Sequence, residues 1–148
     1  MPKAASTSCV YFHFLHKGFT LSKRTDLKFF IKQLFKREKK KLVELNYIFC
    51  SDATLLAINQ EYLQHDFYTD IISFDLSDSK SAIKGEIYIS IDRVKENAAL
   101  FNASFRQELQ RVIFHGALHL CGYNDKTVTD LAKMRKMEEK YLQLFLQK

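Results

Sequence analysis

Two histidines and an aspartate that lie close together in the sequence could bind a metal ion. His115 and His119 are four residues apart in an apolar segment, so on a helix their imidazoles lie one turn apart on the same face. Gly122 can end that helix and turn the chain back, which would bring the carboxylate of Asp125 to the same point. Two imidazoles and one carboxylate make a three-ligand site that leaves a position open for water or substrate. The pattern predicts a metal-dependent hydrolase in which these three residues are both metal ligands and catalytic residues.

Each part of this pattern also has a simpler interpretation. A single histidine on a helix is more often a surface or hydrogen-bonded residue, and a glycine after a helix is usually its C-cap. Here the spacing, the glycine and the carboxylate occur together within eleven residues, which favours the metal site. Gly116 stands where the H-E-x-x-H motif of zinc proteases has its general-base glutamate. This difference argues against peptide hydrolysis by the usual route.

The histidine segment resembles the signature of a known family. The run His115-Gly-x-Leu-His119-Leu-x-Gly-Tyr is similar to that of the YbeY endoribonucleases. Further positions follow the family pattern in the same order: Asn59, Tyr62, residues 69–74 (TDIISF), residues 85–87 (GEI), Glu108 and Met134. The resemblance covers about residues 44–142, which is most of the chain.

This resemblance implies an activity, a substrate and a location. It implies a metal-dependent endoribonuclease, specific for single-stranded RNA, that matures the 3′ end of the small-subunit ribosomal RNA and takes part in ribosome quality control. The expected partners are this RNA and the ribosome or ribosomal proteins, and the expected location is the cytoplasm. Two other functions stay open. One is a ribosome-associated RNA-binding factor with a structural metal, and the other is a metallohydrolase that acts on a substrate other than RNA.

The chain departs from the family pattern at three positions. Asp125 replaces the family's usual third histidine ligand. Leu63, just after Tyr62, stands where the family tends to carry an arginine, and Tyr68, just before Thr69, where it tends to carry a proline. A carboxylate oxygen binds zinc well, so one zinc ion per chain is the expected cofactor, although two histidines and a carboxylate also suit iron. Leu63 removes a cation that could have held an RNA phosphate.

Size, charge and cysteine content agree with this prediction. The 148 residues are enough for one domain with a substantial core, and a net charge of +6 favours contact with a polyanion such as RNA. Cys9, Cys50 and Cys121 form neither a CxxC motif nor a disulfide framework, so we expect reduced thiols. No run approaches the ~20 apolar residues that cross a bilayer, so no membrane partner is expected. His13 and His16 interrupt the first apolar segment, which is unlike a signal peptide.

Hydrophobic periodicity predicts an α+β fold in a single domain over residues 1–148, with residues 1–8 frayed. We expect strands at residues 10–14, 44–49, 71–75 and 86–90, joined in part by a loop over residues 76–84. We expect helices with N-caps at Ser22, Asp52 and Ser104, a helix from Ile91 to about Leu100, and a final helix that starts at either Thr127 or Thr129. This order predicts about four strands in one mixed sheet packed with helices, and a metal site on a helix beside the sheet. On that helix Leu109, Val112, Ile113, Gly116 and Leu120 should face the core, with Glu108, Arg111 and the two histidines on the adjacent face.

Other polar residues are weaker candidates for the site. Asp70 is equally compatible with a turn and with a site role, while Ser73 and Glu86 are better explained by strand packing and by a solvated strand end. His65 could replace a phosphate contact, but a surface histidine is the simpler interpretation. The lysine-rich residues 36–41 are most simply a solvated helix end that complements the helix dipole, with an RNA-phosphate contact as the alternative.

Overall fold

A four-stranded mixed sheet lies at the centre of the structure, a computed structural model in which residues 9–64 and 69–147 are described. Its strand order is β1-β2-β4-β3, in which β1, β2 and β4 are parallel and β3 runs antiparallel to β4. The strands are β1 (Val10–Phe14), β2 (Lys41–Cys50), β3 (Ile71–Asp75) and β4 (Ala82–Ser90). The helices of the described residues are α2 (Arg24–Arg37), α3 (Asp52–Tyr62), α4 (Ile91–Leu100), α5 (Phe105–Leu120) and α6 (Val128–Leu146). The predicted α+β class and mixed sheet are confirmed.

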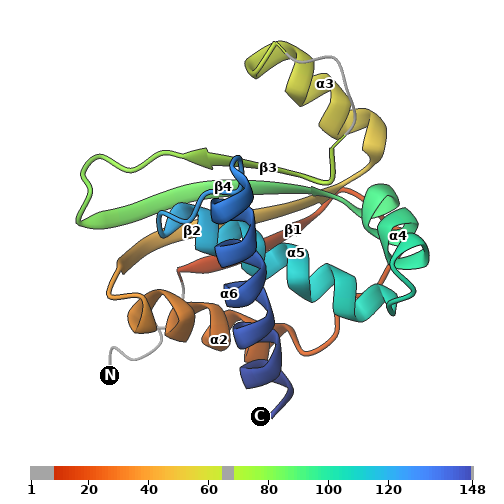
Figure 1. Ribbon diagram of the computed structural model, residues 1–148. Coiled ribbons are helices and arrows are strands. Elements are labelled where there is room, and N and C mark those ends of the chain that lie inside the picture. The colour runs from red at the N-terminus through yellow and green to blue at the C-terminus, as the bar shows by residue number, and fades with distance from the viewer. Residues whose placement is uncertain (1–8, 65–68, 148) are drawn as a thin grey trace.

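Helices cover the two faces of the sheet unequally (Figure 1). Helices α2, α5 and α6 lie on one face, and α3 lies on the other. The main hydrophobic core fills the space between the sheet and the first group of helices. A smaller cluster of Cys50, Leu55 and Ile72 lies beneath α3. The histidine helix α5 therefore packs directly on the sheet, and all five residues predicted for its core face are buried.

Two glycines allow α5 to lie close to the sheet. A Cβ on Gly116 of α5 would lie 2.9 Å from Cδ1 of Ile87. A Cβ on Gly85 of β4 would lie 2.8 Å from Cδ1 of Leu120. Because interiors are packed to crystal-like density, a larger residue at either position would push the helix and the sheet apart. The close packing of α5 on the sheet therefore explains the glycine at position 116, where zinc proteases carry a glutamate.

Two predicted N-cap residues, Ser22 and Asp52, are each wrong by one position. Helix α2 begins after Lys23, whose backbone is left-handed (φ 57°) and whose side chain makes no cap, while the hydroxyl of Ser22 accepts a hydrogen bond from Arg106. Helix α3 is capped by Ser51, whereas Asp52 accepts a hydrogen bond from an arginine of α4. In both cases a tertiary contact uses the side chain that the local pattern assigned to the helix end. The predicted caps of α5 and α6 are confirmed, the latter at the first of its two candidate threonines.

Two strands are longer than the hydrophobic pattern predicted. Strand β2 begins at Lys41 and β4 begins at Ala82, and these two residues are register partners. Their pairing extends both strands into polar sequence, because ladder hydrogen bonds do not depend on side-chain polarity. The predicted loop over residues 76–84 therefore shortens to 76–81, and Glu86 lies inside β4 instead of at its start.

Some predicted features lie outside the described residues, namely the frayed residues 1–8, His65 and Tyr68. In the described part of the chain the three cysteines are free thiols, and Cys50 and Cys121 are buried. None of the helices described there is both long enough and apolar enough to cross a membrane.

Candidate active site

The turn at the end of α5 fixes the position of His119. Gly122 follows the C-cap residue with a φ of +112°, a conformation that residues with a side chain rarely adopt. Its N–H donates to the carbonyl of His119 and the next N–H donates to that of Leu118, both at 3.1 Å, which is the Schellman arrangement. The same turn brings the carbonyl oxygen of Tyr123 to 2.8 Å from Nδ1 of His119. The exposed imidazole is therefore held by the backbone of its own turn.

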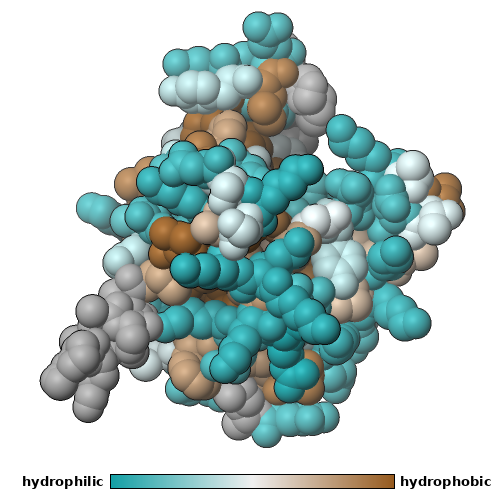
Figure 2. Space-filling model, turned by 90° about the vertical axis from the view of Figure 1, so that its left-hand side faces the viewer, coloured by the Kyte–Doolittle hydropathy of each residue, from teal (hydrophilic) through white to brown (hydrophobic). Residues whose placement is uncertain are grey.

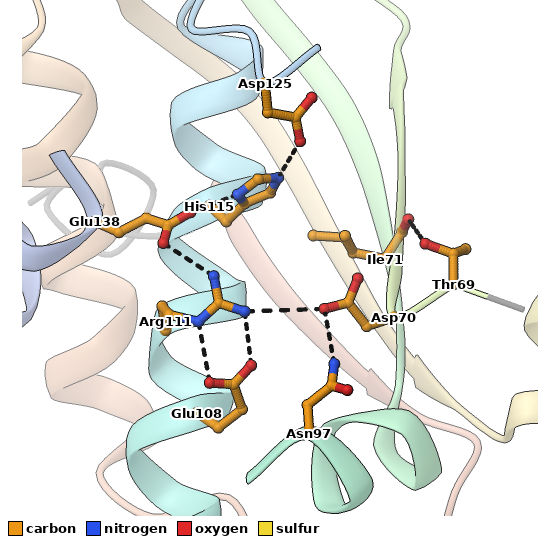
Figure 3. A network of polar contacts seen from close by, with 9 residues as sticks. All are labelled: Thr69, Asp70, Ile71, Asn97, Glu108, Arg111, His115, Asp125 and Glu138. Carbon is orange, nitrogen blue, oxygen red and sulfur yellow. Dashed lines mark hydrogen bonds and ion pairs between the residues drawn. The ribbon is translucent and has the colours of Figure 1, made fainter. Parts of the chain in front are cut away.

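His115 lies between two carboxylates, one of which comes from a different helix (Figure 3). Its Nδ1 is hydrogen-bonded to Oε2 of Glu138 on α6 at 2.6 Å, and its Nε2 lies 3.2 Å from Oδ2 of Asp125. The Glu138 side chain is 2% exposed and that of Asp125 is 36% exposed. Because Nδ1 is engaged on the buried side, Nε2 is the nitrogen that faces the open side of the site.

The donor atoms suit a metal ion, although the structure does not bring all three predicted ligands together. Both imidazoles have Nδ1 engaged by another acceptor, as is usual for metal-binding histidines, and Nε2 of His115 faces the carboxylate of Asp125. Two atoms that each lie about 2.1 Å from a tetrahedral zinc ion are about 3.4 Å apart, close to the 3.2 Å between His115 and Asp125. Across residues 9–64 and 69–147, however, no group of three or more His, Cys, Asp or Glu side chains is arranged to hold a metal ion. The three-ligand site that includes His119 stays a prediction.

Arg111 joins the carboxylates behind His115 (Figure 3). Its guanidinium donates to Glu108 at 3.0 and 2.6 Å and to Glu138 at 2.9 Å, and Nη2 lies 4.0 Å from Asp70. The side chains of Glu108 and Glu138 are 3% and 2% exposed. Buried charges are tolerated only when they are paired and hydrogen-bonded, and this arginine supplies both conditions.

Burial and pairing shift the pKa values of this network in opposite directions. Burial raises the pKa of Asp70, and the positive charges of Arg111 and His115 offset this only in part. Burial alone would raise the pKa of Glu138, but the hydrogen bond from His115 and the charge of Arg111 bring it below its ordinary value. Glu138 is therefore ionised at neutral pH and accepts the Nδ1 proton of His115 strongly.

A cleft of about 230 Å³ opens beside the two histidines. Asn59 and Leu63 border it from α3 and the residue after α3, and Thr69 and Ser73 border it from the region of β3. Three of the segments that resembled the family in sequence, at Asn59, at residues 69–74 and at the two histidines, therefore border one cleft. Ser73, for which strand packing was the simpler prediction, lines the cleft. Leu63 also lines it, with an apolar side chain.

Sequence reasoning missed the most important partner of the site. Glu138 was expected only as one residue of the last helix, yet it is the hydrogen-bond partner of His115. Its signal was its position among the buried Met134, Tyr141 and Leu142, because a lone carboxylate on a buried helix face needs a cation or a hydrogen-bond donor.

Other candidates contact residues that do not border the histidine cleft. His13 is hydrogen-bonded to Asn46 at 2.7 Å, and His16 is hydrogen-bonded to Asp92 at 3.0 Å. Glu86 accepts a hydrogen bond from the hydroxyl of Tyr88 on the same strand. These three residues therefore have hydrogen-bond partners of their own away from the cleft.

Known proteins resemble this chain in sequence and in structure. The family described as "Endoribonuclease YbeY" matches residues 17–146. Endoribonuclease YbeY of Cytophaga hutchinsonii is 48% identical over 126 residues, which are 85% of this chain and 88% of the relative. That of Flavobacterium psychrophilum is 55% identical over 108 residues, or 73% and 76% of the two chains. The solution structure of a Thermotoga maritima protein matches with a TM-score of 0.64 at 30% identity, over 90% of this chain and 88% of that one. The chain belongs to the YbeY endoribonuclease family.

Proposed function

We propose that this chain is a metal-dependent endoribonuclease that cleaves single-stranded RNA in the 3′-end maturation of small-subunit ribosomal RNA and in ribosome quality control. Family membership supports the reaction class. The observation that carries the metal assignment is the pair of histidines beside one cleft, with Nδ1 bound at 2.6 Å to Glu138 and at 2.8 Å to the Tyr123 carbonyl. This arrangement leaves the Nε2 atoms available as ligands.

In this proposal His115, His119 and Asp125 hold one zinc ion per chain. When bound, the ion supplies a Lewis acid for the phosphodiester and lowers the pKa of a bound water toward ~7. Glu138 keeps the ring of His115 in one orientation and increases the basicity of its Nε2, since an ionised acceptor binds the Nδ1 proton. The carbonyl of Tyr123 orients the ring of His119 in the same way.

The cleft supplies contacts for the RNA strand itself. The hydroxyls of Thr69 and Ser73 can hydrogen-bond to sugar or base edges, and Leu63 offers an apolar contact to a base. A peptidase is disfavoured, because Gly116 is packed against the side chain of Ile87 and leaves no space for a general-base glutamate. An RNA-binding factor with a structural metal would bind RNA and depend on metal for stability, but it would not cleave.

The metal content of the full chain, purified without chelators, tests the ligand set. We expect about one zinc ion per wild-type chain, loss of the ion in Asp125→Ala, and its retention in Asp125→His, because histidine is also a zinc ligand. Asp75→Ala is the matched control, since this aspartate does not border the histidine cleft. Equal metal content in the wild type and in Asp125→Ala would remove Asp125 from the ligand set.

Cleavage of a precursor fragment from the 3′ end of small-subunit ribosomal RNA tests the reaction. The wild type should cleave single-stranded but not duplex regions, and His119→Ala should lose cleavage while its circular dichroism spectrum stays native. Cleavage by His119→Ala at the wild-type rate would overturn the proposed metal mechanism. Metal-dependent stability of the wild type without any cleavage would favour the RNA-binding factor.

A further inference from the structure

The net positive charge of the chain is concentrated in one segment. Residues 28–41 contain seven of the 23 Lys and Arg side chains but only one of the 17 Asp and Glu side chains, which gives the segment a charge of +6. Sixteen of each sign remain elsewhere, so the rest of the chain is neutral. The segment comprises the last ten residues of α2, the turn after it and the first residue of β2. The dipole at a helix C-terminus amounts to only about half an elementary charge and cannot account for so many cations.

Five of these cations are exposed and together form what we call the basic patch: Lys36, Arg37, Lys39, Lys40 and Lys41. None of the five is in an ion pair with a carboxylate of the described residues. The single acidic residue of the segment, Glu38, accepts hydrogen bonds from the hydroxyls of Tyr123 and Tyr141. Its carboxylate is therefore engaged with the turn after α5 and with α6, and the patch keeps a dense positive charge.

Two adjoining surface hollows extend from the basic patch to the end of the histidine helix. Lys40 borders both a hollow of about 390 Å³ within the patch and a second one of about 530 Å³. The second hollow extends to Gly122, at the end of the histidine helix, and to Asp75 of β3. Asp75 lies on the same face of β3 as Ser73, which borders the histidine cleft. Figure 2 views this side, with the end of α2 and the β3–β4 turn toward the reader, and hydrophilic side chains cover most of it.

The histidine cleft lacks cations of its own for phosphate. No Lys or Arg is among the described residues that line it. The nearby Arg111 is committed to Glu108 and Glu138. Single-stranded RNA carries a negative charge at each nucleotide, and its affinity for proteins depends on cations along the path of its backbone. Such cations must therefore lie outside the cleft.

We propose that the basic patch binds the phosphate backbone of the RNA strand whose scissile segment occupies the histidine cleft. This inference rests on the proposed function. The strand leaves the cleft past the end of α5, where the middle hollow reaches Gly122, and meets the patch at Lys40, which borders this hollow and the one within the patch. The middle hollow is bordered by two carboxylates, Asp75 and Asp78, and by two cations, Lys40 and Lys80, of which Lys40 also belongs to the basic patch.

Charge removal at the patch tests the inference. The test variant carries Lys36→Gln, Lys39→Gln and Lys40→Gln, three exposed positions at which glutamine keeps the side-chain length and removes the charge. A matched control carries three exposed substitutions elsewhere, Lys17→Gln, Lys84→Gln and Lys136→Gln. Binding of oligouridylate to the full chain is followed by fluorescence anisotropy, on a timescale shorter than cleavage. Two lengths are used, a trinucleotide and an oligomer of about 16 nucleotides, the upper end of site sizes for compact single-strand binding domains.

The patch variant should bind the long oligomer on the order of 100-fold more weakly than the wild type at 0.1 M salt, and its salt slope should fall by about 2, the release expected for three phosphate contacts. Its affinity for the trinucleotide should equal that of the wild type, and the control variant should match the wild type for both lengths. Equal affinity and salt slope in the wild type and the patch variant would overturn the inference, as would an equal loss in the control variant. Tighter binding of polyglutamate than of RNA by the wild type would overturn it in favour of an acidic protein partner.

The outcomes for the two proposals are separable. A wild type that binds the long oligomer through the patch but cleaves no RNA would support the inference and remove the proposed function. If the wild type cleaves RNA and the patch variant keeps the wild-type affinity and salt slope, the proposed function is supported and the inference about the basic patch is overturned.

Discussion

His115 and His119 lie one turn apart on the same helix, yet the protein holds them in different ways. The ring of His115 is bound by the buried carboxylate of Glu138, 23 residues away in sequence, which Arg111 in turn holds. The ring of His119 is bound by the carbonyl of Tyr123, four residues away, in a turn that Gly122 makes possible. The first support is a tertiary network of charges, and the second is local backbone structure.

The two kinds of contact therefore differ in how much stability the protein loses when one of them is removed. A buried ion network is expensive to break, because the charges that remain have lost both water and their partner. A local turn stores only backbone strain, and water can replace a lost contact at its exposed histidine. Substitutions in the ion network behind His115 should therefore lower the stability of the whole fold. Substitutions in the turn that holds His119 should affect only the structure of that turn.

The largest expected effect comes from Arg111→Met, which would leave the carboxylates of Glu108 and Glu138 buried without their cation. We expect the free energy of unfolding in urea to fall by about 3–5 kcal/mol. Arg106→Met on the same helix is the control. It removes an exposed arginine that donates to the hydroxyl of Ser22 and should cost less than about 1 kcal/mol. Equal losses in the two variants would contradict the role assigned to the network.

A smaller effect, on metal binding, is expected from Glu138→Gln. The amide is a weaker acceptor for the Nδ1 proton of His115 than the carboxylate, so zinc affinity should fall by about 10- to 100-fold in a chelator competition assay. Glu139→Gln, at the adjacent exposed position, should bind zinc like the wild type. If both variants kept wild-type affinity, the ring of His115 would not depend on α6.

Gly122→Ala tests whether the turn after α5 positions His119 independently of His115. An added Cβ would meet no atom within 4 Å, so the cost is only the strain of a side chain at φ +112°, about 1–2 kcal/mol. The imidazole nitrogen resonances of His119 should shift in NMR spectra while those of His115 stay in place. Equal shifts of both histidines would mean that the two supports are coupled.

The smallest effect concerns Asp70 and is a change with pH. Because burial raises its pKa in the folded state, the unfolded chain loses this proton first as pH rises. Its contribution to stability is therefore greatest below the unfolded pKa of about 4 and declines as pH rises through the folded value. The unfolding free energy of Asp70→Asn, measured relative to wild type, should increase from pH 4 to pH 7. A difference that stays constant over this range would contradict the raised pKa.

The sequence by itself determined the local parts of the fold and site. The spacing of His115 and His119, the glycine turn after them and the cap at Ser104 involve contacts within a few residues, and such contacts leave a readable pattern. The apolar face of α5 was predictable for the same reason. The class of fold followed from the order of these elements.

The tertiary structure decided the parts that depend on residues far apart in sequence. The pairing of Glu138 with His115 and Arg111 requires α6 to pack against α5, and no local pattern specifies which of its carboxylates will meet the histidine. The extension of β2 to Lys41 depends on its register with β4. The hollow that joins the basic patch to the end of the histidine helix likewise exists only because α2, α5 and β3 end on the same side of the molecule. A sequence records which charges are present, but packing decides which of them share a surface and which are neutralised in the interior.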